Sequence, residues 1–312
     1  MSARGASRIA PVLLVHGGAG DLDSEEDRRQ YLLGVGGALD AGLAALADGG
    51  ACAAVRAAVV HLESHTIMNA GRGSVLDRAG AACLDAGFMD GSTRRWGGVT
   101  GVRRCMNPVL LAERLRADGD YGRLLGAPGS DELAALFGVP ACDPSELVTE
   151  RARRIWAQRC REAAPAGAAP QLDTVGAVAL DGDGHVAAAV STGGMSLKRS
   201  GRIGDSPVVG AGFWAADREG ACVTTGVGEV LLRQGTARRC VQLMADGCEP
   251  SDAAAGALAE LVDWPGDERG LSGLIVVAPD GRFALDHNSR EMSGGWARPD
   301  GTREVTHLWR GR

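Results

Sequence analysis

Leu172-Asp173-Thr174-Val175-Gly176-Ala177-Val178-Ala179-Leu180 is the stretch that decides the fold. A run rich in Pro, Ala and Gly precedes it, and an apolar, β-branched segment follows at once. This junction is typical of a flexible linker that meets a buried strand. The strand opens with a threonine, whose hydroxyl is a poor nucleophile unless a base lies beside it. If the Asp173–Thr174 bond breaks, the new α-amine of Thr174 is that base. The alternative is an ordinary β-branched residue that opens a strand.

Composition limits the class of protein. The 312 residues permit one large domain or two smaller ones, and a hydrophobic content of 45% is enough for a sizeable core. The net charge of −6 argues against nucleic acid or an anionic membrane as a partner. The apolar run 9–15 is too short to span a bilayer and leads into glycines, so we expect a cytoplasmic protein. Eight cysteines without CxxC pairs are most simply reduced core residues.

The pattern along the chain changes from helices to strands around residue 174. Helices are expected over 25–47, 51–62, 107–116, 143–161, 228–244 and 251–262. Strands are expected over 11–15, 74–76, 81–85, 96–102, 174–180, 186–191, 208–215, 221–225, 273–278 and 282–285, the last two forming a final hairpin. This order predicts two packed sheets with helices outside, in one domain that contains a processing site within the linker 163–173.

Polar groups cluster after Thr174. Thr192 ends the strand that pairs with the Thr174 strand, so its hydroxyl is expected beside the Thr174 hydroxyl. Arg202 and Asp205 lie three residues apart in one loop. Together they suit the α-carboxylate and α-ammonium of an amino acid, and the alternative is a mutual salt bridge. The stretch 224–229 ends a strand and opens a helix, where N–H groups and a hydroxyl can stabilise an oxyanion.

Two further segments have open interpretations. The glycines of His16-Gly17-Gly18-Ala19-Gly20 follow a strand, but the GxGxxG and Walker patterns are absent. They suit either a phosphate cradle or a place where one backbone crosses another closely. The irregular segment 63–73 has a polar backbone that suits either a site lining or a cation held by carbonyls.

The motifs together closely resemble the isoaspartyl peptidase/L-asparaginase family, the plant-type asparaginases among the N-terminal-nucleophile hydrolases. The resemblance covers nearly the whole chain, and the order and spacing of its motifs are more specific than any motif alone. The motifs are 16–20 (HGGAG), 69–73 (NAGRG), 84–86 (LDA) with 89–91 (MDG), 107–108 (NP), 173–179 (DTVGAVA), 191–194 (STGG), 201–207 (GRIGDSP) and 225–229 (TGVGE).

The resemblance implies an α+β fold, an αββα sandwich of two mainly antiparallel sheets flanked by helices. It also implies self-cleavage between Asp173 and Thr174 into chains 1–173 and 174–312, and a dimer of the cleaved αβ units. The roles that it implies are a Thr174 nucleophile, a Thr192 hydroxyl neighbour, an oxyanion hole of Thr225 and Gly226, and substrate-binding Arg202, Asp205, Gly228 and Asn69. No cofactor is required. A structural sodium ion held by the backbone carbonyls of Leu62, Glu63 and Ile67 is implied as well.

The implied reaction is hydrolysis of β-aspartyl amides, either asparagine or isoaspartyl dipeptides, through an acyl-threonine. A glycosylasparaginase-like hydrolase and an amino-acid-binding relative that never matures are the alternatives. The chain departs from its relatives at Leu172, where many have His or Gly, and at Val227, where a hydroxyl residue is common. An apolar wall at residue 227 favours isoaspartyl dipeptides with an apolar second residue.

Overall fold

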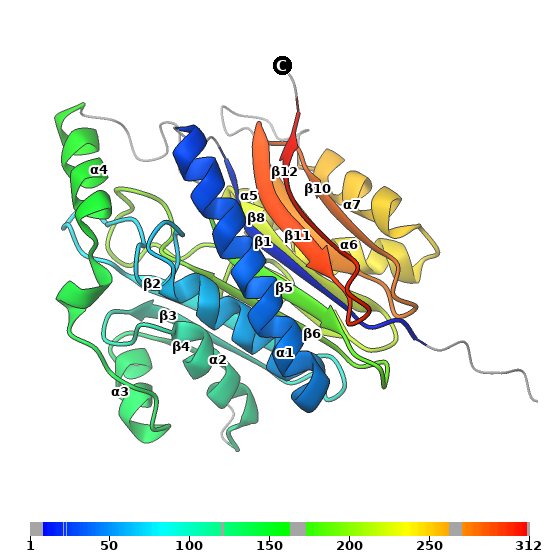
Figure 1. Ribbon diagram of the computed structural model, residues 1–312. Helices are drawn as coiled ribbons and strands as arrows, with labels where there is room; N and C mark the ends of the chain where they lie inside the picture. Colours follow the sequence, from blue (N-terminus) through cyan, green and yellow to red (C-terminus); the bar gives the residue numbers. More distant parts are fainter. Residues whose placement is uncertain are drawn as a thin grey trace, which may run out of the picture.

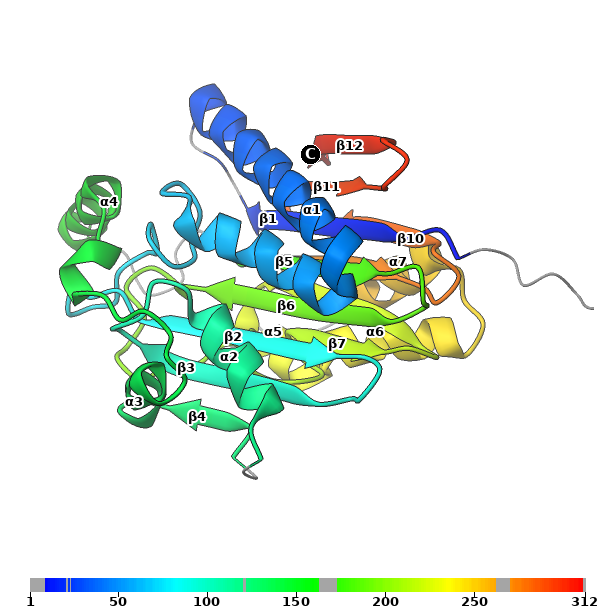
Figure 2. The same cartoon turned by 60° about the horizontal axis from the view of Figure 1, so that its bottom comes forward.

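The computed structural model describes residues 9–20, 22, 24–119, 122–162, 173–261 and 270–310. Four layers are stacked in the order helix, sheet, sheet, helix (Figures 1 and 2). The larger sheet has the strand order β12-β11-β1-β5-β6-β2-β3-β4, and the smaller has the order β10-β9-β8-β7. All described pairs within them are antiparallel except β3 with β4. The predicted αββα sandwich is confirmed.

In the described part of the chain, the larger sheet has eight strands, which come from both halves of the sequence. Their bounds are β1 Val12–Gly20, β2 Leu84–Asp90, β3 Trp96–Val102, β4 Leu124–Gly126, β5 Val175–Leu180, β6 Val186–Thr192, β11 Glu291–Ala297 and β12 Arg303–Trp309. The strand that follows Thr174, β5, lies between β1 and β6 in the middle of this sheet. Residues on either side of the Asp173–Thr174 bond therefore share one core.

The smaller sheet and the helices complete the layers. The strands are β7 Phe213–Ala216, β8 Gly220–Gly226, β9 Ser272–Val277 and β10 Phe283–His287. The helices are α1 Glu25–Ser64, α2 Pro108–Ala117, α3 Gly129–Leu136, the 3-10 turn η1 Pro144–Leu147, α4 Glu150–Arg161, α5 Gly228–Gln234, α6 Thr236–Ala245 and α7 Pro250–Ala259. In Figure 2, α1 and α2 cover the outer face of the larger sheet, and α6 and α7 cover that of the smaller one.

The position of β5 between two apolar layers explains why the sequence after Thr174 is apolar without interruption. Val175 and Ala177 pack toward α1 and α2, whereas Val178 and Leu180 pack between the two sheets. Both faces of the strand are buried, so the polar-apolar alternation of a half-exposed strand is absent. A third cluster, between the smaller sheet and α5 to α7, completes the core.

Several expected elements are corrected in their bounds. The helices expected over 25–47 and 51–62 form one element, α1, kinked at Gly50, whose φ is 70°. The Asp181 carboxylate accepts the Ala51 N–H at 3.0 Å and so caps the second half. The helix expected over 143–161 is divided into η1 and α4, because Thr149 caps α4. Gly235, with a left-handed φ of 65°, divides the helix expected over 228–244 into α5 and α6.

One strand prediction fails where a side chain, rather than a neighbouring strand, accepts hydrogen bonds from the backbone N–H groups. The strand expected over 74–76 is reduced to one bridge between Leu76 and Ala82, because the Asp77 carboxylate accepts the N–H groups of Ala79 and Ala81. The strand expected over 81–85 begins later, as β2, and that expected over 208–215 is shortened to β7.

The chain also continues beyond the hairpin that was expected to be the last. β11 and β12 form a further hairpin that pairs with β1. The glycines in β11 hid its strand character. The expected linker spans 163–173, and its residues 163–172 lie outside the described residues.

Helix α1 is long and apolar enough to cross a membrane by length and composition alone. Its contacts give a simpler explanation, because it packs against β1, β5, β6 and β11 of the larger sheet. Its own side chains of Tyr31, Leu39 and Leu62 are fully or almost fully buried. A core helix of this kind meets the same criterion as a membrane span.

Candidate active site

Thr174 lies where β5 begins, and three threonine hydroxyls meet there. Its Oγ1 lies 3.2 Å from Thr192 Oγ1. Its backbone N–H donates to Thr225 Oγ1 at 3.2 Å. The three side chains come from the residue just before β5, from β6 and from β8, and all are buried. The structure therefore brings together the predicted nucleophile, its hydroxyl neighbour and one predicted oxyanion residue.

The position of Thr192 follows from the β5–β6 hairpin. Val175 is directly opposite Ser191, so the end of β6 lies beside the start of β5. The Thr192 hydroxyl also accepts the N–H of Gly194 at 2.9 Å. Asn69 supports this turn, since its amide donates to the Gly194 carbonyl at 2.8 Å and its Oδ1 accepts the Val75 N–H. Asn69, predicted to bind substrate, thus has both ends of its side-chain amide engaged in holding the turn.

The end of β8 presents an N–H group to the site. Thr224 N–H donates to the Gly212 carbonyl, on the side of β8 away from β9, whereas Val227 N–H donates to Leu271 of the β9 side. Successive residues of a strand direct their N–H groups to alternate sides. The Gly226 N–H therefore points away from β9, on the same side as that of Thr224. An N–H not used within the sheet is what an oxyanion hole needs.

The loop before β7 places a buried acid beside an arginine. Asp205 is 3% exposed and accepts a hydrogen bond from the Thr224 hydroxyl at 3.1 Å. Burial raises the pKa of Asp205 to about 6, although the Arg202 charge and the Thr224 hydroxyl act in the opposite direction. A Cβ added at Gly228 would lie 2.8 Å from Arg202 Nη2 and 3.1 Å from Asp205 Oδ1. Arg202, Asp205 and Gly228 thus meet, as predicted.

Arg202 has a partner that the sequence interpretation did not name. Its Nε and Nη2 donate to the two carboxylate oxygens of Glu229 at 2.8 and 2.7 Å. Within the described residues, the ion pair of Arg202 is with Glu229, so the alternative of a mutual Arg202–Asp205 salt bridge is not the arrangement seen. Glu229 is the last residue of the motif 225–229 (TGVGE). An acidic residue in the first turn of a helix is also expected from the helix dipole alone, so the motif did not indicate this pairing.

The bond before Thr174 is held from two sides. Tyr31 on α1 donates its hydroxyl to Asp173 Oδ2 at 2.6 Å. Gly18, with a φ of 126°, approaches so closely that a Cβ there would lie 2.7 Å from Asp173 Cα. The glycine-rich segment 16–20 therefore serves as a close backbone crossing, in strand β1. Tyr31 carried no sequence signal, because nothing in α1 indicates which of its residues faces residue 173.

His16 is the other group buried at this junction. Burial lowers the pKa of His16 to about 3, and the neighbouring Thr174 backbone offsets this only in part. Neither ring nitrogen makes a well-formed hydrogen bond with the described residues. A Cβ added at Gly176 would lie 2.6 Å from His16 Nε2, so the imidazole fills the space that this glycine leaves. His16 is therefore a neutral packing group beside β5.

The predicted sodium loop is compact. Leu62 O accepts the His65 N–H at 3.1 Å, and Glu63 O accepts the Arg72 N–H at 2.8 Å. A carbonyl oxygen has two lone pairs, so neither of these hydrogen bonds prevents the Leu62 or Glu63 carbonyl from also ligating a cation. The Glu63 side chain is not available, because it faces Asn107 and Val109, and burial raises its pKa to about 8. Over the described ranges, no group of three or more His, Cys, Asp or Glu residues suits a metal ion.

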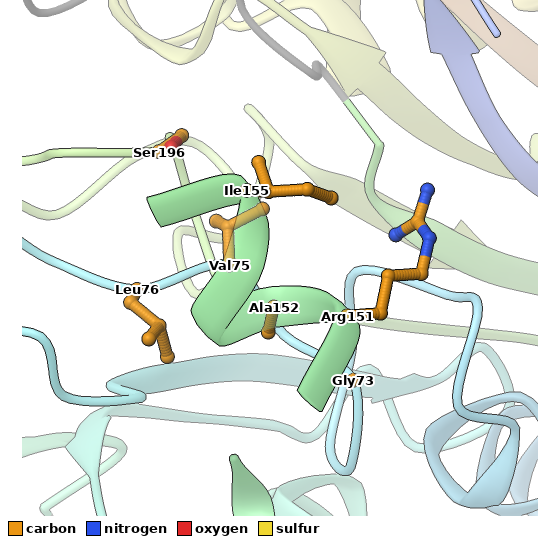
Figure 3. Close-up of a pocket in the computed structure, with 7 residues that line it drawn as sticks. All are labelled: Gly73, Val75, Leu76, Arg151, Ala152, Ile155 and Ser196. Carbon is orange, nitrogen blue, oxygen red and sulfur yellow. The ribbon is translucent and has the colours of Figure 1, made fainter. Parts of the chain in front are cut away.

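A separate small pocket lies between α4 and the segment 73–76 (Figure 3). Ala152 and Ile155 of α4 face Val75 there, and Arg151 extends to one side, where its guanidinium lies 3.8 Å from Asp27. None of the predicted site residues lines this pocket. It is a packing gap beneath α4.

Two stacked, mainly antiparallel sheets between helices, with a threonine that opens a central strand, are the fold of the N-terminal-nucleophile hydrolases. Comparison with known proteins agrees. The family model described as asparaginase matches residues 9–307. The chain belongs to this asparaginase family.

Curated relatives align over almost the full length. An isoaspartyl peptidase/L-asparaginase of Xenopus laevis is 38% identical, over 93% of this chain and 92% of the relative. A plant-type L-asparaginase of Pyrobaculum calidifontis is 40% identical, over 93% of this chain and 98% of the relative. The human isoaspartyl peptidase/L-asparaginase is 38% identical, over 92% of both chains.

Proposed function

We propose that the chain is a self-processing hydrolase of β-aspartyl amides, with Thr174 as its nucleophile. The observation that carries this proposal is the contact of the Thr174 hydroxyl with Thr192 and of its backbone nitrogen with Thr225, at 3.2 Å each. Family membership and the names of the relatives, isoaspartyl peptidase/L-asparaginase, support the substrate class.

Maturation is the first step of the proposal. While the Asp173–Thr174 bond is intact, the Thr174 nitrogen is an amide and cannot act as a base. The Thr174 hydroxyl attacks the Asp173 carbonyl carbon, the C–N bond breaks, and the acyl group passes to oxygen as an ester. Water then hydrolyses the ester, which releases chains 1–173 and 174–312 and leaves a free Thr174 amine. An amine has an unperturbed pKa of roughly 8, so a substantial fraction is neutral near physiological pH.

Hydrolysis then repeats the chemistry on a substrate. The amine takes the hydroxyl proton as Thr174 Oγ1 attacks the side-chain carbonyl of a β-aspartyl compound. The Gly226 N–H and the Thr225 hydroxyl stabilise the oxyanion, an effect worth roughly 3 kcal/mol per well-placed donor. Ammonia or an amine leaves, and water releases aspartate from the acyl-threonine.

Arg202 and Asp205 select the substrate in this proposal. The guanidinium binds the α-carboxylate and the Asp205 carboxylate attracts the α-ammonium, beside the backbone of Gly228. With both α-groups held there, only a β-linked carbonyl reaches Thr174. Asparagine and isoaspartyl dipeptides are therefore accepted, and ordinary α-peptides are rejected.

Substrate assays test this proposal. The purified enzyme should hydrolyse isoaspartyl-leucine and asparagine, and leave aspartyl-leucine with an α-linkage intact. Hydrolysis of N-acetylglucosaminyl-asparagine in preference to both would make the chain a glycosylasparaginase-like enzyme instead. A single uncut band on a denaturing gel after long incubation, without hydrolysis, would support an amino-acid-binding relative that does not mature.

We further propose that two cleaved αβ units associate, that the enzyme works in the cytoplasm, and that the Leu62, Glu63 and Ile67 carbonyls hold sodium. Size-exclusion chromatography with light scattering tests the association. Thermal unfolding in sodium chloride and in choline chloride at equal ionic strength tests the ion, because a cation bound only to the folded state raises the melting temperature. Equal melting temperatures in the two salts would remove sodium from the account.

A further inference from the structure

Lys198 is chemically singular in this chain. Of 33 basic Lys and Arg residues it is the only lysine. Its side chain is 1% exposed, and its ammonium donates to the Cys83 carbonyl at 2.8 Å. The same ammonium lies 3.6 Å from Asp85 Oδ2, and the Asp85 side chain is 2% exposed. A chain that otherwise uses arginine keeps a compact ammonium at this enclosed position beside the candidate site.

The backbone bends sharply to bring Lys198 inside. Leu197 has a φ of 57°, in the left-handed region that a branched apolar residue rarely adopts. Hydrogen bonds fix the bend, since Leu197 N–H donates to Leu76 O at 2.9 Å and Arg78 N–H donates to Lys198 O at 3.0 Å. Strain of this kind persists where the surroundings enforce it, often near functional sites.

The ion pair touches the turn that carries Thr192. A Cβ added at Gly194 would lie 2.7 Å from Lys198 Nζ and 2.9 Å from its Cδ, so the lysine packs directly against this glycine. Gly194 N–H in turn donates to Thr192 Oγ1 at 2.9 Å. From the other side, Asp85 is directly opposite Thr192 in the β2–β6 pairing. Lys198 therefore packs against Gly194, and Asp85 lies opposite Thr192 on the neighbouring strand.

We propose that the buried Lys198–Asp85 ion pair is a positioning device, which sets the Thr192 hydroxyl against the Thr174 hydroxyl and so controls the rate of the chemical step. This inference rests on the proposed role of Thr174 and Thr192. Lys198 already lies within 3 Å of a Cβ built on Gly194, and a guanidinium is wider than an ammonium, so this close packing favours lysine. The Leu84-Asp85-Ala86 motif, to which the reaction itself assigns no task, supplies the anion.

A double-mutant cycle separates positioning from mere stability. Lys198→Met, Thr192→Ala and the combined variant are assayed with isoaspartyl-leucine, and rates are expressed per matured Thr174 amino terminus, counted by intact mass. Lys198→Met should lower kcat by about tenfold or more with KM changed less than about threefold, because an interaction used in the transition state is lost. In the Thr192→Ala background, the same change should lower kcat by less than about twofold, because the pair acts through Thr192.

A matched control lies on the same strand. Asp90, at the other end of β2, pairs with Arg116 at 2.7 Å, with side chains 11% and 17% exposed. Arg116→Met should lower the melting temperature and leave kcat unchanged. If Lys198→Met lowers the melting temperature by the same amount with kcat also unchanged, the pair is only structural and the proposal is overturned. Independent, multiplicative losses of kcat in Lys198→Met and Thr192→Ala overturn it as well.

Two more variants keep the test informative if Lys198→Met folds poorly. Removing one partner leaves a buried charge unpaired, whereas Lys198→Met/Asp85→Leu replaces the pair by apolar groups of similar shape and should fold. Its crystal structure should show the Thr174 Oγ1–Thr192 Oγ1 distance lengthened beyond the present 3.2 Å. An unchanged distance with wild-type kcat overturns the positioning role. Full hydrolytic activity in Thr174→Ala would instead contradict the proposed function itself.

Discussion

Arg202 and Glu229 form a two-pronged ion pair in which Nε and Nη2 of the arginine meet both carboxylate oxygens, at 2.8 and 2.7 Å. The arginine side chain is 17% exposed and the glutamate side chain 45% exposed. One edge of the guanidinium is thus occupied, and the Nη1 edge faces Gly204, where a Cβ would lie 2.8 Å away. Glu229 therefore fixes the orientation of the fork. In the proposed function, the α-carboxylate of a substrate binds at the edge that remains.

The first prediction concerns this fork. Arg202→Lys keeps the charge but loses both the planar geometry and the pairing with Glu229. A charge-assisted hydrogen bond contributes roughly 1.5–3 kcal/mol, so KM for asparagine should rise at least about tenfold while kcat falls less. Steady-state kinetics of Arg202→Lys and Arg202→Ala measure this. Wild-type KM in both variants would remove Arg202 from the substrate site.

The second prediction is a pH dependence of binding. The pKa of Asp205 is raised to about 6, so the carboxylate is charged above this pH and neutral below it. Only the charged form attracts an α-ammonium. The affinity for the product L-aspartate should therefore fall, and its Kd should rise, as the pH is lowered through about 6. Calorimetry from pH 8 to pH 5 measures this Kd. Asp205→Asn should bind weakly with little change over this range, and a constant Kd in the wild-type enzyme down to pH 5 would contradict the assignment.

The third prediction concerns maturation. Tyr31 donates to the Asp173 carboxylate at 2.6 Å, beside the bond that is cut. Tyr31→Phe removes this hydrogen bond to a charged acceptor, worth roughly 1.5–3 kcal/mol, and should slow self-cleavage by about tenfold or more. The measurement is a time course of intact masses after rapid purification. Once mature, the variant should have wild-type kcat, and an unchanged cleavage half-time would show that Tyr31 only packs.

The fourth prediction concerns Val227. It is the N-cap residue of α5 and makes no side-chain cap. Val227→Thr supplies a hydroxyl cap and should raise the free energy of unfolding by about 1 kcal/mol, measured as a shift of the urea midpoint at constant m-value. Val227→Ala, which adds no cap, is the control. Equal midpoints for the Thr and Ala variants would exclude the cap.

The same variant tests substrate preference. Val227 is half-buried at the N-terminus of α5. Its side chain packs against the apolar cluster between the smaller sheet and α5 to α7. Loss of one methyl-sized apolar contact costs roughly 0.8 kcal/mol. The ratio of kcat/KM for isoaspartyl-leucine to that for asparagine should fall about fourfold in Val227→Thr. If the ratio is the same in both proteins, residue 227 acts only on the helix.

The sequence predicted those parts of the fold that local pattern determines. The buried run after Thr174, the hairpin at residues 181–184 and the order of helices and strands were sufficient for the four layers. They also placed Thr192 beside Thr174, because a hairpin returns the end of one strand to the start of the other. Element bounds were less predictable where one side chain diverts the backbone, as Asp77 and Gly235 do.

Long-range partners in the site were beyond sequence reasoning. Tyr31 meets Asp173 across 142 positions, and Lys198 meets Cys83 across 115. No periodicity encodes such a contact, because it depends on how layers stack rather than on any one element. Glu229 belongs to the motif 225–229, yet only the structure shows that it pairs with Arg202.

The central claim is that Thr174 becomes a free amino terminus by its own attack and then acts as the nucleophile. Intact-mass analysis of the purified wild-type and Thr174→Ala proteins tests it most directly. We predict two chains, 1–173 and 174–312, for the wild type with hydrolysis of isoaspartyl-leucine, and one uncut, inactive chain for Thr174→Ala. Cleavage of Thr174→Ala at the wild-type rate, or full activity in an uncut wild-type chain, would contradict the account.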